Sequence, residues 1–174
     1  MIVMMKISRG MENLFNNQIA MEASASNYYL SMASWSEVTG YEGAASFLYQ
    51  QADEERQHML KIVHYMNNLG VQAKIPSIKE PTSNFNSLES VFKAALKSEQ
   101  SVTQAINKMV DVAQKEKDHS SYTFLQWFVT EQVQEETKFE TILQKFDLIG
   151  RDKIAINEID RQLGAMATQA TNAA

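Results

Sequence analysis

The chain has 174 residues, a formal net charge of −5 at pH 7 and no cysteine. This length fits one domain spanning residues 1–174, because a chain of this size can bury about 70% of its unfolded surface. The absence of cysteine excludes disulfide scaffolds, thiolate metal sites, iron–sulfur clusters and cysteine nucleophiles. A mildly acidic chain is not typical of a nucleic-acid-binding protein, so we expect no nucleic-acid partner.

The apolar residues are dispersed along the chain, and the mean hydropathy is −0.33. No apolar run reaches the roughly 18 residues that a membrane-spanning helix needs. We therefore expect no membrane partner. Because no targeting motif is visible, a cytoplasmic location is the expectation.

Four long helices are predicted by apolar residues that recur at intervals of three or four positions. The expected ranges are residues 11–39, 42–70, 87–115 and 119–148. Helices often end at a glycine, and the glycines at the expected ends are Gly40, Gly70 and Gly150.

Capping signals precede three of these helices. Thr39 with Glu42, and Asn86 with Glu89, have the spacing of a capping box. Asp118 directly precedes the fourth helix, where a carboxylate cap is favoured.

The connection at residues 71–86 contains both prolines and is expected to be an extended crossover. A short fifth helix is expected at about residues 151–165, and the chain ends are expected to fray. The other junctions are short. The sequence therefore predicts an all-α fold: an antiparallel four-helix bundle over residues 11–148, with one long crossover and a short fifth C-terminal helix.

Each apolar stripe is interrupted near its middle by a glutamate. These residues are Glu22, Glu55, Glu99 and Glu135. Counting from the turns at Gly40 and Asp118 brings the glutamates of each hairpin to nearly the same level along the bundle. His58, three residues after Glu55, points the same way, and Gln132 lies at the same level. The spacing predicts one polar layer across the middle of the bundle.

Four buried carboxylates need compensating positive charge, because an isolated buried charge is very costly. We expect no Lys or Arg on the stripes near this layer, which leaves His58 as its one basic side chain. The simplest compensation is a pair of divalent or trivalent cations. Carboxylate and imidazole ligands suit iron or manganese, and glutamates combined with Glu-x-x-His are typical of di-iron carboxylate centres.

At these residues the chain resembles the bacterial non-haem ferritins, from residue 11 through the fifth helix. The motifs that carry the resemblance are Glu22 with Tyr29, Tyr41–Ala45, Asp53–His58, Glu99 with Gln100, and Phe124–Trp127 followed by Glu131 and Gln132. Each motif alone is weak, whereas their order and spacing together are specific.

The resemblance implies a ferritin-like fold and an iron-storage protein with ferroxidase activity. Such a protein oxidises Fe²⁺ with O₂ at a di-iron centre within each subunit and deposits ferric mineral inside a 24-subunit homo-oligomeric cage. The implied first iron ligands are Glu22, Glu55 and His58, with Glu55 bridging to a second iron on Glu99 and Glu135. Gln132 would lie beside that second iron. Tyr29 would lie next to the centre as an electron donor or hydrogen-bonding group.

The family also has a third iron site, which Glu54, Glu131 and Glu135 match. Gln134 stands where another glutamate is usual, so this third site is expected to be weaker. We expect no haem, because Arg56 follows the bridging glutamate where haem-binding bacterioferritins place a methionine.

Other readings of the same residues stay open. The fourth helix lacks a second Glu-x-x-His, whereas di-iron oxidases of organic substrates usually have two. The C-terminal stretch at residues 165–174 is uncharged, unlike the basic tails of many DNA-protecting mini-ferritins. A non-catalytic shell subunit would not need the ligand set. A hydrated polar belt is the alternative for the buried layer, an exposed face for Glu54 and Glu131, and plain packing for Tyr29.

Overall fold

The computed structural model describes residues 7–173, which form five α-helices and no strand. The helices are α1 (Arg9–Thr39), α2 (Glu42–Asn68), α3 (Leu88–Glu116), α4 (His119–Ile149) and α5 (Lys153–Ala173). The predicted all-α bundle is confirmed, and the ends of the four long helices lie within two residues of their expected positions. No helix of this described part is both long and apolar enough to cross a membrane.

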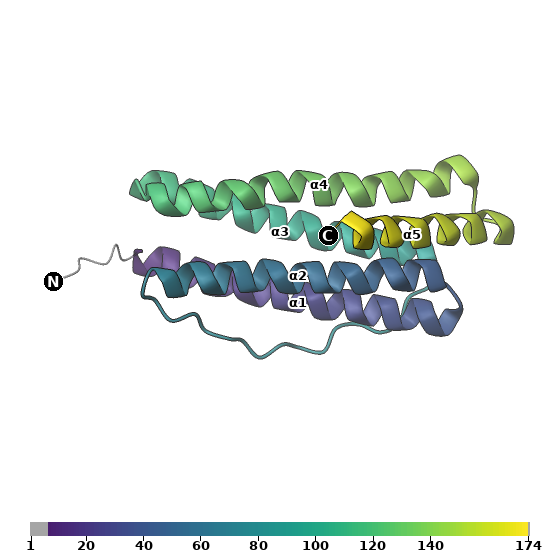
Figure 1. Cartoon of the computed structure of the whole chain (residues 1–174), viewed down its shortest axis with the longest axis horizontal. Helices are drawn as coiled ribbons and strands as arrows, with labels where there is room; N and C mark the ends of the chain where they lie inside the picture. Colours follow the sequence, from purple (N-terminus) through teal and green to yellow (C-terminus); the bar gives the residue numbers. More distant parts are fainter. Residues whose placement is uncertain (1–6, 174) are drawn as a thin grey trace.

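Two antiparallel hairpins, α1 with α2 and α3 with α4, lie side by side along the long axis (Figure 1). The crossover after α2 is extended, as expected, and follows α1 for most of its length. The Lys74 amide donates to Asn16 Oδ1 (2.8 Å), and the Ser31 hydroxyl donates to Thr82 O (2.7 Å). The crossover thereby returns the chain to the end of the bundle at which α2 began.

The helix ends agree with the sequence at some caps and differ at others. Gly40 ends α1 in the left-handed conformation (φ 96°), and Asp118 caps α4 by accepting from the Ser121 amide (3.0 Å). The capping box expected at Asn86 is wrong by one residue, because Ser87 and Ser90 exchange these bonds instead.

The box expected at Thr39 is also wrong, since its hydroxyl donates to Trp35 O and no side chain next to α2 caps that helix. A distant residue does so instead. Asp160 of α5 accepts from the amides of Gly43 (3.2 Å) and Ala44 (2.8 Å) at the start of α2. A tertiary contact therefore replaces the predicted local cap.

The fifth helix is longer than expected, because it continues to Ala173 rather than ending near residue 165. Its alanine-rich second half has a high helix propensity. It packs on α2 so closely that a Cβ on Gly43 would lie 1.9 Å from Asp160 O. The Gln50 side-chain amide also donates to Ala167 O (2.7 Å). The C-terminal fraying was expected over residues 168–174, but residues 168–173 belong to this helix. Residues 1–6 and 174 lie outside the described residues.

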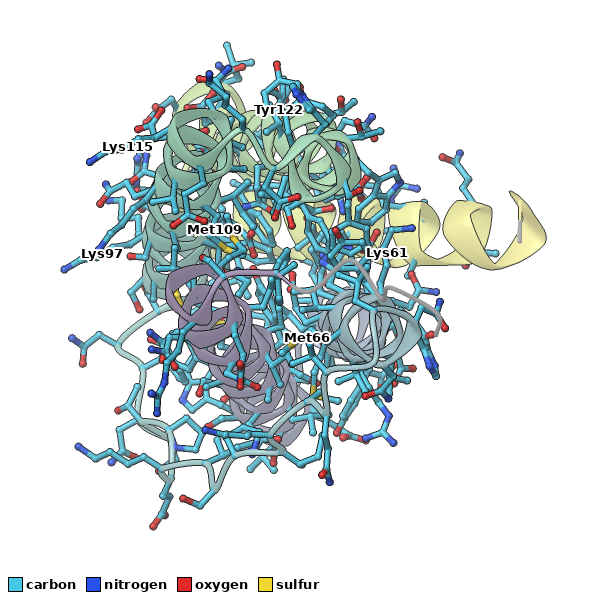
Figure 2. All side chains as sticks on the ribbon, turned by 90° about the vertical axis from the view of Figure 1, so that its left-hand side faces the viewer. Lys61, Met66, Lys97, Met109, Lys115 and Tyr122 are labelled. Carbon is cyan, nitrogen blue, oxygen red and sulfur yellow. The ribbon has the colours of Figure 1, made fainter. Side chains whose placement is uncertain are left out.

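The apolar core is divided into two clusters along the bundle. The cluster near the α5 end is centred on large side chains such as Leu48, Phe92, Phe139 and Phe146. The cluster near the opposite end includes Phe15, Ile62, Met66 and Met109. Figure 2 looks onto that end and shows Met66 and Met109 inside the bundle, with Lys97 and Lys115 pointing outward. A layer of buried polar side chains separates the two clusters.

Candidate metal centre

The polar layer receives side chains from all four bundle helices. Its members are Glu22 of α1, Glu55 and His58 of α2, Glu99 of α3, and Gln132 and Glu135 of α4, none more than 4% exposed. Helical periodicity puts each of them on the inward stripe of its own helix. The structure thus brings together the residues that the sequence placed at one level.

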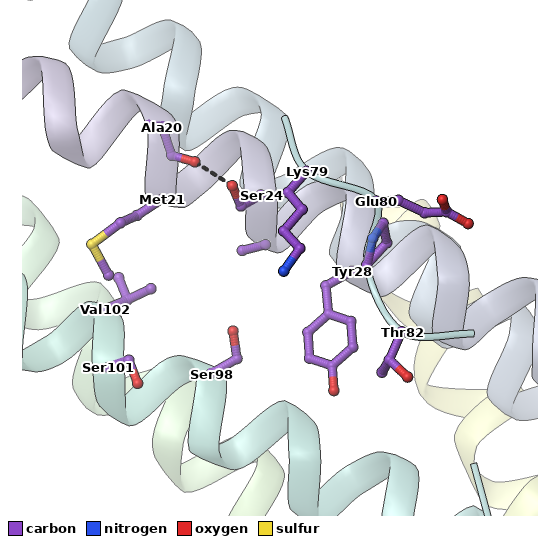
Figure 3. A pocket seen from close by; sticks show the side chains of 12 residues that line it. Ala20, Met21, Ser24, Tyr28, Lys79, Glu80, Thr82, Ser98, Ser101 and Val102 are labelled. Carbon is purple, nitrogen blue, oxygen red and sulfur yellow. Dashed lines mark hydrogen bonds between the residues drawn. The ribbon is translucent and has the colours of Figure 1, made fainter. Parts of the chain in front are cut away.

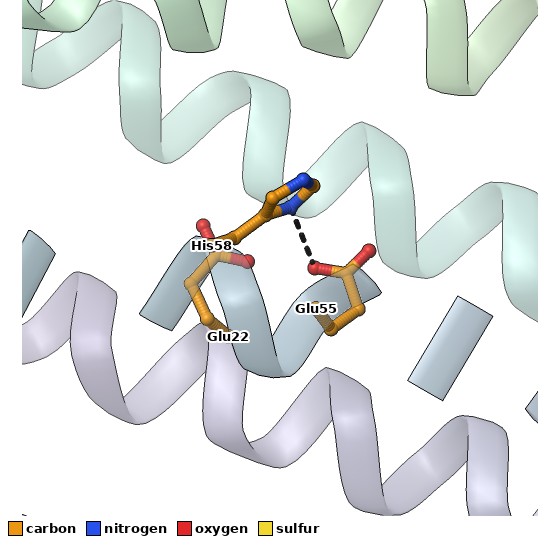
Figure 4. Close-up of side chains that lie close together, drawn as sticks. All are labelled: Glu22, Glu55 and His58. Atoms are coloured by element: carbon orange, nitrogen blue, oxygen red, sulfur yellow. Dashed lines mark hydrogen bonds and ion pairs between the residues drawn. The ribbon is translucent and has the colours of Figure 1, made fainter. Parts of the chain in front are cut away.

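The side chains of Glu22, Glu55 and His58 point into a common space between α1 and α2 (Figure 4). We call these three residues the α1–α2 ligand set. One ligand atom from each lies within 4.8 Å of the others, and His58 Nδ1 is 3.2 Å from Glu55 Oε2. Two oxygens of these side chains, Glu22 Oε2 and Glu55 Oε1, are buried and have no hydrogen-bond partner, and Glu55 Oε1 is the oxygen that faces away from His58.

Unpartnered carboxylate oxygens in a dry interior are strongly unfavourable unless a cation or a proton compensates them. Two carboxylates and an imidazole are suitable ligands for a divalent cation, whose charge would compensate the carboxylates. The unsatisfied oxygens of the α1–α2 ligand set therefore fit a metal ion.

The remaining polar side chains, Glu99, Gln132 and Glu135, form the α3–α4 ligand set. Here the carboxylates already have donors. Glu99 accepts from the Tyr29 hydroxyl and from Gln132 Nε2 (3.1 Å). Glu135 accepts from Gln51 Nε2 at 3.1 Å. Among residues 7–173, neither glutamate belongs to a three-residue group with metal-ligand spacing.

Lys138 also binds Glu135, which corrects the expectation that no lysine lies near the layer. Its Nζ is 2.7 Å from Glu135 Oε1 and 3.3 Å from Glu54 Oε2. Lys138 lies one turn after Glu135 at the edge of the inward face, and its long side chain reaches back to the carboxylate. The i, i+3 spacing of the two residues was the signal that could have revealed the pair.

The electrostatics of the layer follow from burial. Burial raises the pKa of Glu22, Glu55 and Glu99, and neighbouring carboxylates add to the rise. Burial also raises the pKa of Glu135 to about 7, although the Lys138 ammonium opposes the rise. Burial and the Glu99 carboxylate raise the pKa of Tyr29, which keeps its hydroxyl a neutral donor. The layer is therefore short of positive charge.

Of the three residues predicted to form the third site, Glu54 and Glu131 lie close together and Glu135 does not join them. Ligand atoms of Glu54, His58 and Glu131 lie within 4.8 Å of one another, with His58 Nε2 4.0 Å from Glu131 Oε1. Glu135 is not in this group and meets Glu54 through Lys138. His58 therefore lies between the α1–α2 ligand set and this more exposed pair.

The contacts of three residues with the layer, those of two glutamines and one threonine, were not anticipated. Gln18 donates to Glu22 Oε1 (2.8 Å), and Gln51 bonds both Glu135 and Lys138. Both glutamines precede a layer glutamate by four residues, the spacing that would have indicated a contact with the layer. Thr103 links Gln132 to Glu136 at the surface.

A separate groove lies on the other side of α1, between that helix, the crossover and α3 (Figure 3). Its lining includes Met21, Tyr28, Lys79 and Ser98 and contains none of the buried glutamates. The candidate centre is inside the bundle and does not open into this groove.

Comparison with known proteins agrees with the fold. Residues 12–149 match the family model of the ferritin-like domain. The chain therefore belongs to the ferritin family, and the resemblance seen in the sequence is confirmed.

The chain is also similar to particular members. It is 39% identical to the probable bacterial non-heme ferritin-like protein of Haemophilus influenzae, over 94% of this chain and 99% of that protein. It is 36% identical to the bacterial non-heme ferritin of Staphylococcus aureus, over 91% and 96% respectively. The crystal structure of an open pore ferritin from the archaeon Archaeoglobus fulgidus superposes with a TM-score of 0.89 at 36% identity, covering 91% of this chain and 98% of that one.

Proposed function

We propose that this protein stores iron, oxidising Fe²⁺ with O₂ in the polar layer and retaining the ferric product as a mineral inside a shell of identical subunits. The observation that carries the proposal is that two buried carboxylates with metal-ligand spacing to His58, those of Glu22 and Glu55, each have an oxygen without a hydrogen-bond partner. Membership of the ferritin family supports it.

The residues of the layer have different roles in binding iron. Glu22, Glu55 and His58 bind the first Fe²⁺. Glu55 lies between the two ligand sets and is shared with a second Fe²⁺ on Glu99 and Glu135, beside Gln132. Tyr29 holds the Glu99 carboxylate through its hydroxyl. Glu54 and Glu131 are a weaker third position, and no haem takes part.

Carboxylates favour the oxidation because their attraction for a cation grows with its charge, so they stabilise Fe³⁺ more than Fe²⁺. Two Fe²⁺ ions give up one electron each, and O₂ accepts both. Iron is here the substrate and the cargo. It must be able to leave, which favours a centre whose second position is held less tightly than the first.

Storage of a mineral requires an enclosed space that one bundle does not have. We propose a 24-subunit homo-oligomeric cage, in the cytoplasm, as the shell. The similarity of the chain to ferritins, among them an open pore ferritin, supports self-assembly. The charge of −5 per chain would concentrate Fe²⁺ at such a shell.

The test is an aerobic Fe²⁺ titration of the purified protein, run directly onto size exclusion with iron detection. We expect far more than two irons per chain to co-elute with protein at very large mass. About two irons per chain on a small oligomer would instead indicate a di-iron oxidase without storage.

A matched pair of variants on α2 links the iron to the layer. Glu55→Ala removes the shared ligand, and the initial oxidation rate should fall at least about 100-fold. Asp53→Ala removes an exposed carboxylate two residues away and should oxidise iron like the parent protein. Fast oxidation in the Glu55 variant would overturn the assignment of the centre.

A further inference from the structure

The Lys138 ammonium has surroundings typical of a bound cation. Its Nζ lies 2.7 and 2.9 Å from the two oxygens of Glu135, 2.9 Å from Gln51 Oε1 and 3.3 Å from Glu54 Oε2. All four contacts are oxygens, and they come from α2 and α4. The ammonium therefore occupies the position from which a metal ion could bind Glu135 and Glu54 together.

The α1–α2 ligand set has no such occupant. Within the described residues, lysine contacts to the layer glutamates are recorded only for Glu135. The buried oxygens that lack partners belong to Glu22 and Glu55, whereas both oxygens of Glu135 are bonded. One set is open to an incoming cation, and the other is closed by a residue of the chain.

We infer that Lys138 is a tethered cation that holds Glu135 and Glu54 in the metal-free protein, and that its ammonium must withdraw before Glu135 can bind the second metal ion. The two positions of the centre then fill in a fixed order, the α1–α2 ligand set first. This inference rests on the proposed function, because it concerns the second ion of the same centre.

The position of Lys138 allows the withdrawal. Its side chain is 24% exposed and that of Glu54 is 38% exposed, whereas Glu135 is 1% exposed, so the ammonium lies between the interior and the surface. Lysine has a flexible four-carbon stem and can extend its charge into solvent. A divalent ion arriving at Glu135 would repel the ammonium at close range and favour this movement.

Lys138 keeps its positive charge while its ammonium contacts Glu135 and Glu54. Burial lowers the pKa of its ammonium, but Glu135 and Glu54 outweigh this effect and raise the pKa above its ordinary value. An incoming metal ion must therefore compete with a full positive charge. In the reverse direction, the returning ammonium replaces the charge of a departing ion, so that iron can leave without stranding a buried carboxylate.

The first experiment is calorimetric titration of the assembled, metal-free protein with Zn²⁺, which is not oxidised. In the parent protein we expect two steps, the second at least about tenfold weaker because Zn²⁺ must displace an ammonium there. Lys138→Met keeps most of the length of the side chain and removes its charge. It should tighten the second step at least about tenfold and change the first less than about threefold.

Lys145→Met is the matched control. Lys145 lies on the same helix, and its Nζ donates to Gln162 (2.7 Å), away from the layer. This variant loses the same charge and should keep both steps of the parent protein. An unchanged second step in Lys138→Met, equal tightening in both variants, or a third ion bound with the second step unchanged would each overturn the inference.

A second measurement uses the unmodified chain and does not depend on the folding of a variant. An amine-reactive ester, read out by peptide mass spectrometry, should label Lys138 at least about threefold faster once the second equivalent of Zn²⁺ is bound, but not after the first. Lys93, 64% exposed, is the internal reference. Equal labelling of Lys138 with and without Zn²⁺ would overturn the inference.

Failure of the proposed function gives a different result. If the parent protein and His58→Ala bind Zn²⁺ identically, the centre itself is misplaced. If the first step depends on His58 and the second ignores Lys138, the centre stands and only the role of Lys138 is wrong.

Discussion

The α1–α2 and α3–α4 ligand sets are equally buried but differ in what surrounds them. Glu22 and Glu55 have buried oxygens without partners, whereas Glu99 and Glu135 are bonded by Tyr29, Gln132, Gln51 and Lys138. The number of carboxylates and their depth are thus poor guides to where a cation binds first. The donors on neighbouring helices decide it, because a satisfied carboxylate must give up bonds that an unsatisfied one lacks.

The largest effect is expected when the His58 imidazole is removed from the α1–α2 ligand set. His58→Ala should weaken binding of both ions at least about 100-fold, because filling of the second position depends on the first. Co²⁺ quenching of Trp127 fluorescence reports the binding, since the Trp127 and His58 ring centres are 5.4 Å apart. The measurement is made in a Trp35→Phe background. The exposed His64, replaced by alanine, serves as the control.

Truncation of a ligand in the α3–α4 ligand set should affect the binding of only one of the two ions. Glu135→Ala should abolish the second Zn²⁺ step and leave the first within about threefold of the parent protein, because the α1–α2 ligand set is intact. Glu140→Ala, an exposed glutamate on α4, is the control. Crystals soaked in Zn²⁺ that lose both ions equally in the Glu135 variant would contradict the division into two sets.

The pH dependence of stability tests the charge deficit that both sets share. Glu135 has an ordinary pKa of 4.5 and a folded pKa of about 7, so the folded state binds its proton more tightly. Its contribution therefore lowers the free energy of unfolding as pH rises from 4.5 to 7, by about 2–3 kcal/mol. The raised pKa values of Glu22, Glu55 and Glu99 act in the same direction.

Metal-free protein should thus unfold at a temperature about 5 °C lower at pH 8 than at pH 5.5, and Zn²⁺ should reverse the difference. Hydrogen bonds from Arg151 and Lys93 lower the pKa of Glu89 to about 2. The contribution of Glu89 to stability is complete above pH 4.5, so it does not change the melting temperature between pH 5.5 and pH 8. Equal or higher thermal stability at pH 8 without metal would show that the layer is already compensated.

The smallest effects distinguish the two sets by size. At pH 8, Glu22→Gln removes an uncompensated charge and should raise the melting temperature of the metal-free protein by about 3 °C. Glu135→Gln also removes a charge that burial makes unfavourable, but it separates Lys138 from its main partner, so it should raise the melting temperature by less than about 1 °C. Equal shifts in differential scanning calorimetry would mean that the two sets are electrostatically alike.

The sequence predicted the bundle well, because each long helix has a regular apolar stripe and a clear end. Counting from Gly40 and Asp118 also predicted the level of the four glutamates, since helical rise is nearly constant. These features depend on local periodicity alone. For the same reason the layer could be located before any contact was known.

Contacts between distant segments could not be obtained in this way. The contact of Lys138 with Glu135 is a local exception, with an i, i+3 spacing that could have revealed it. It was missed because the Cα of Lys138 lies off the centre of the stripe, while its ammonium lies several bonds away beside Glu135. The true cap of α2 is Asp160, more than a hundred residues along the chain, and no local pattern indicates it. The full length of α5 was missed because its small residues resemble a disordered tail.

Through Asp160, α5 supplies the N-terminal cap of α2, the helix that bears Glu55 and His58. The carboxylate compensates the positive end of that helix's dipole, and the close approach of Gly43 and Gly164 leaves no room for a side chain between them. A deletion that removed α5 would therefore uncap α2 as well as shorten the protein. Cargo peptides fused at the C-terminus should follow the complete α5 and leave residues 153–167 in place.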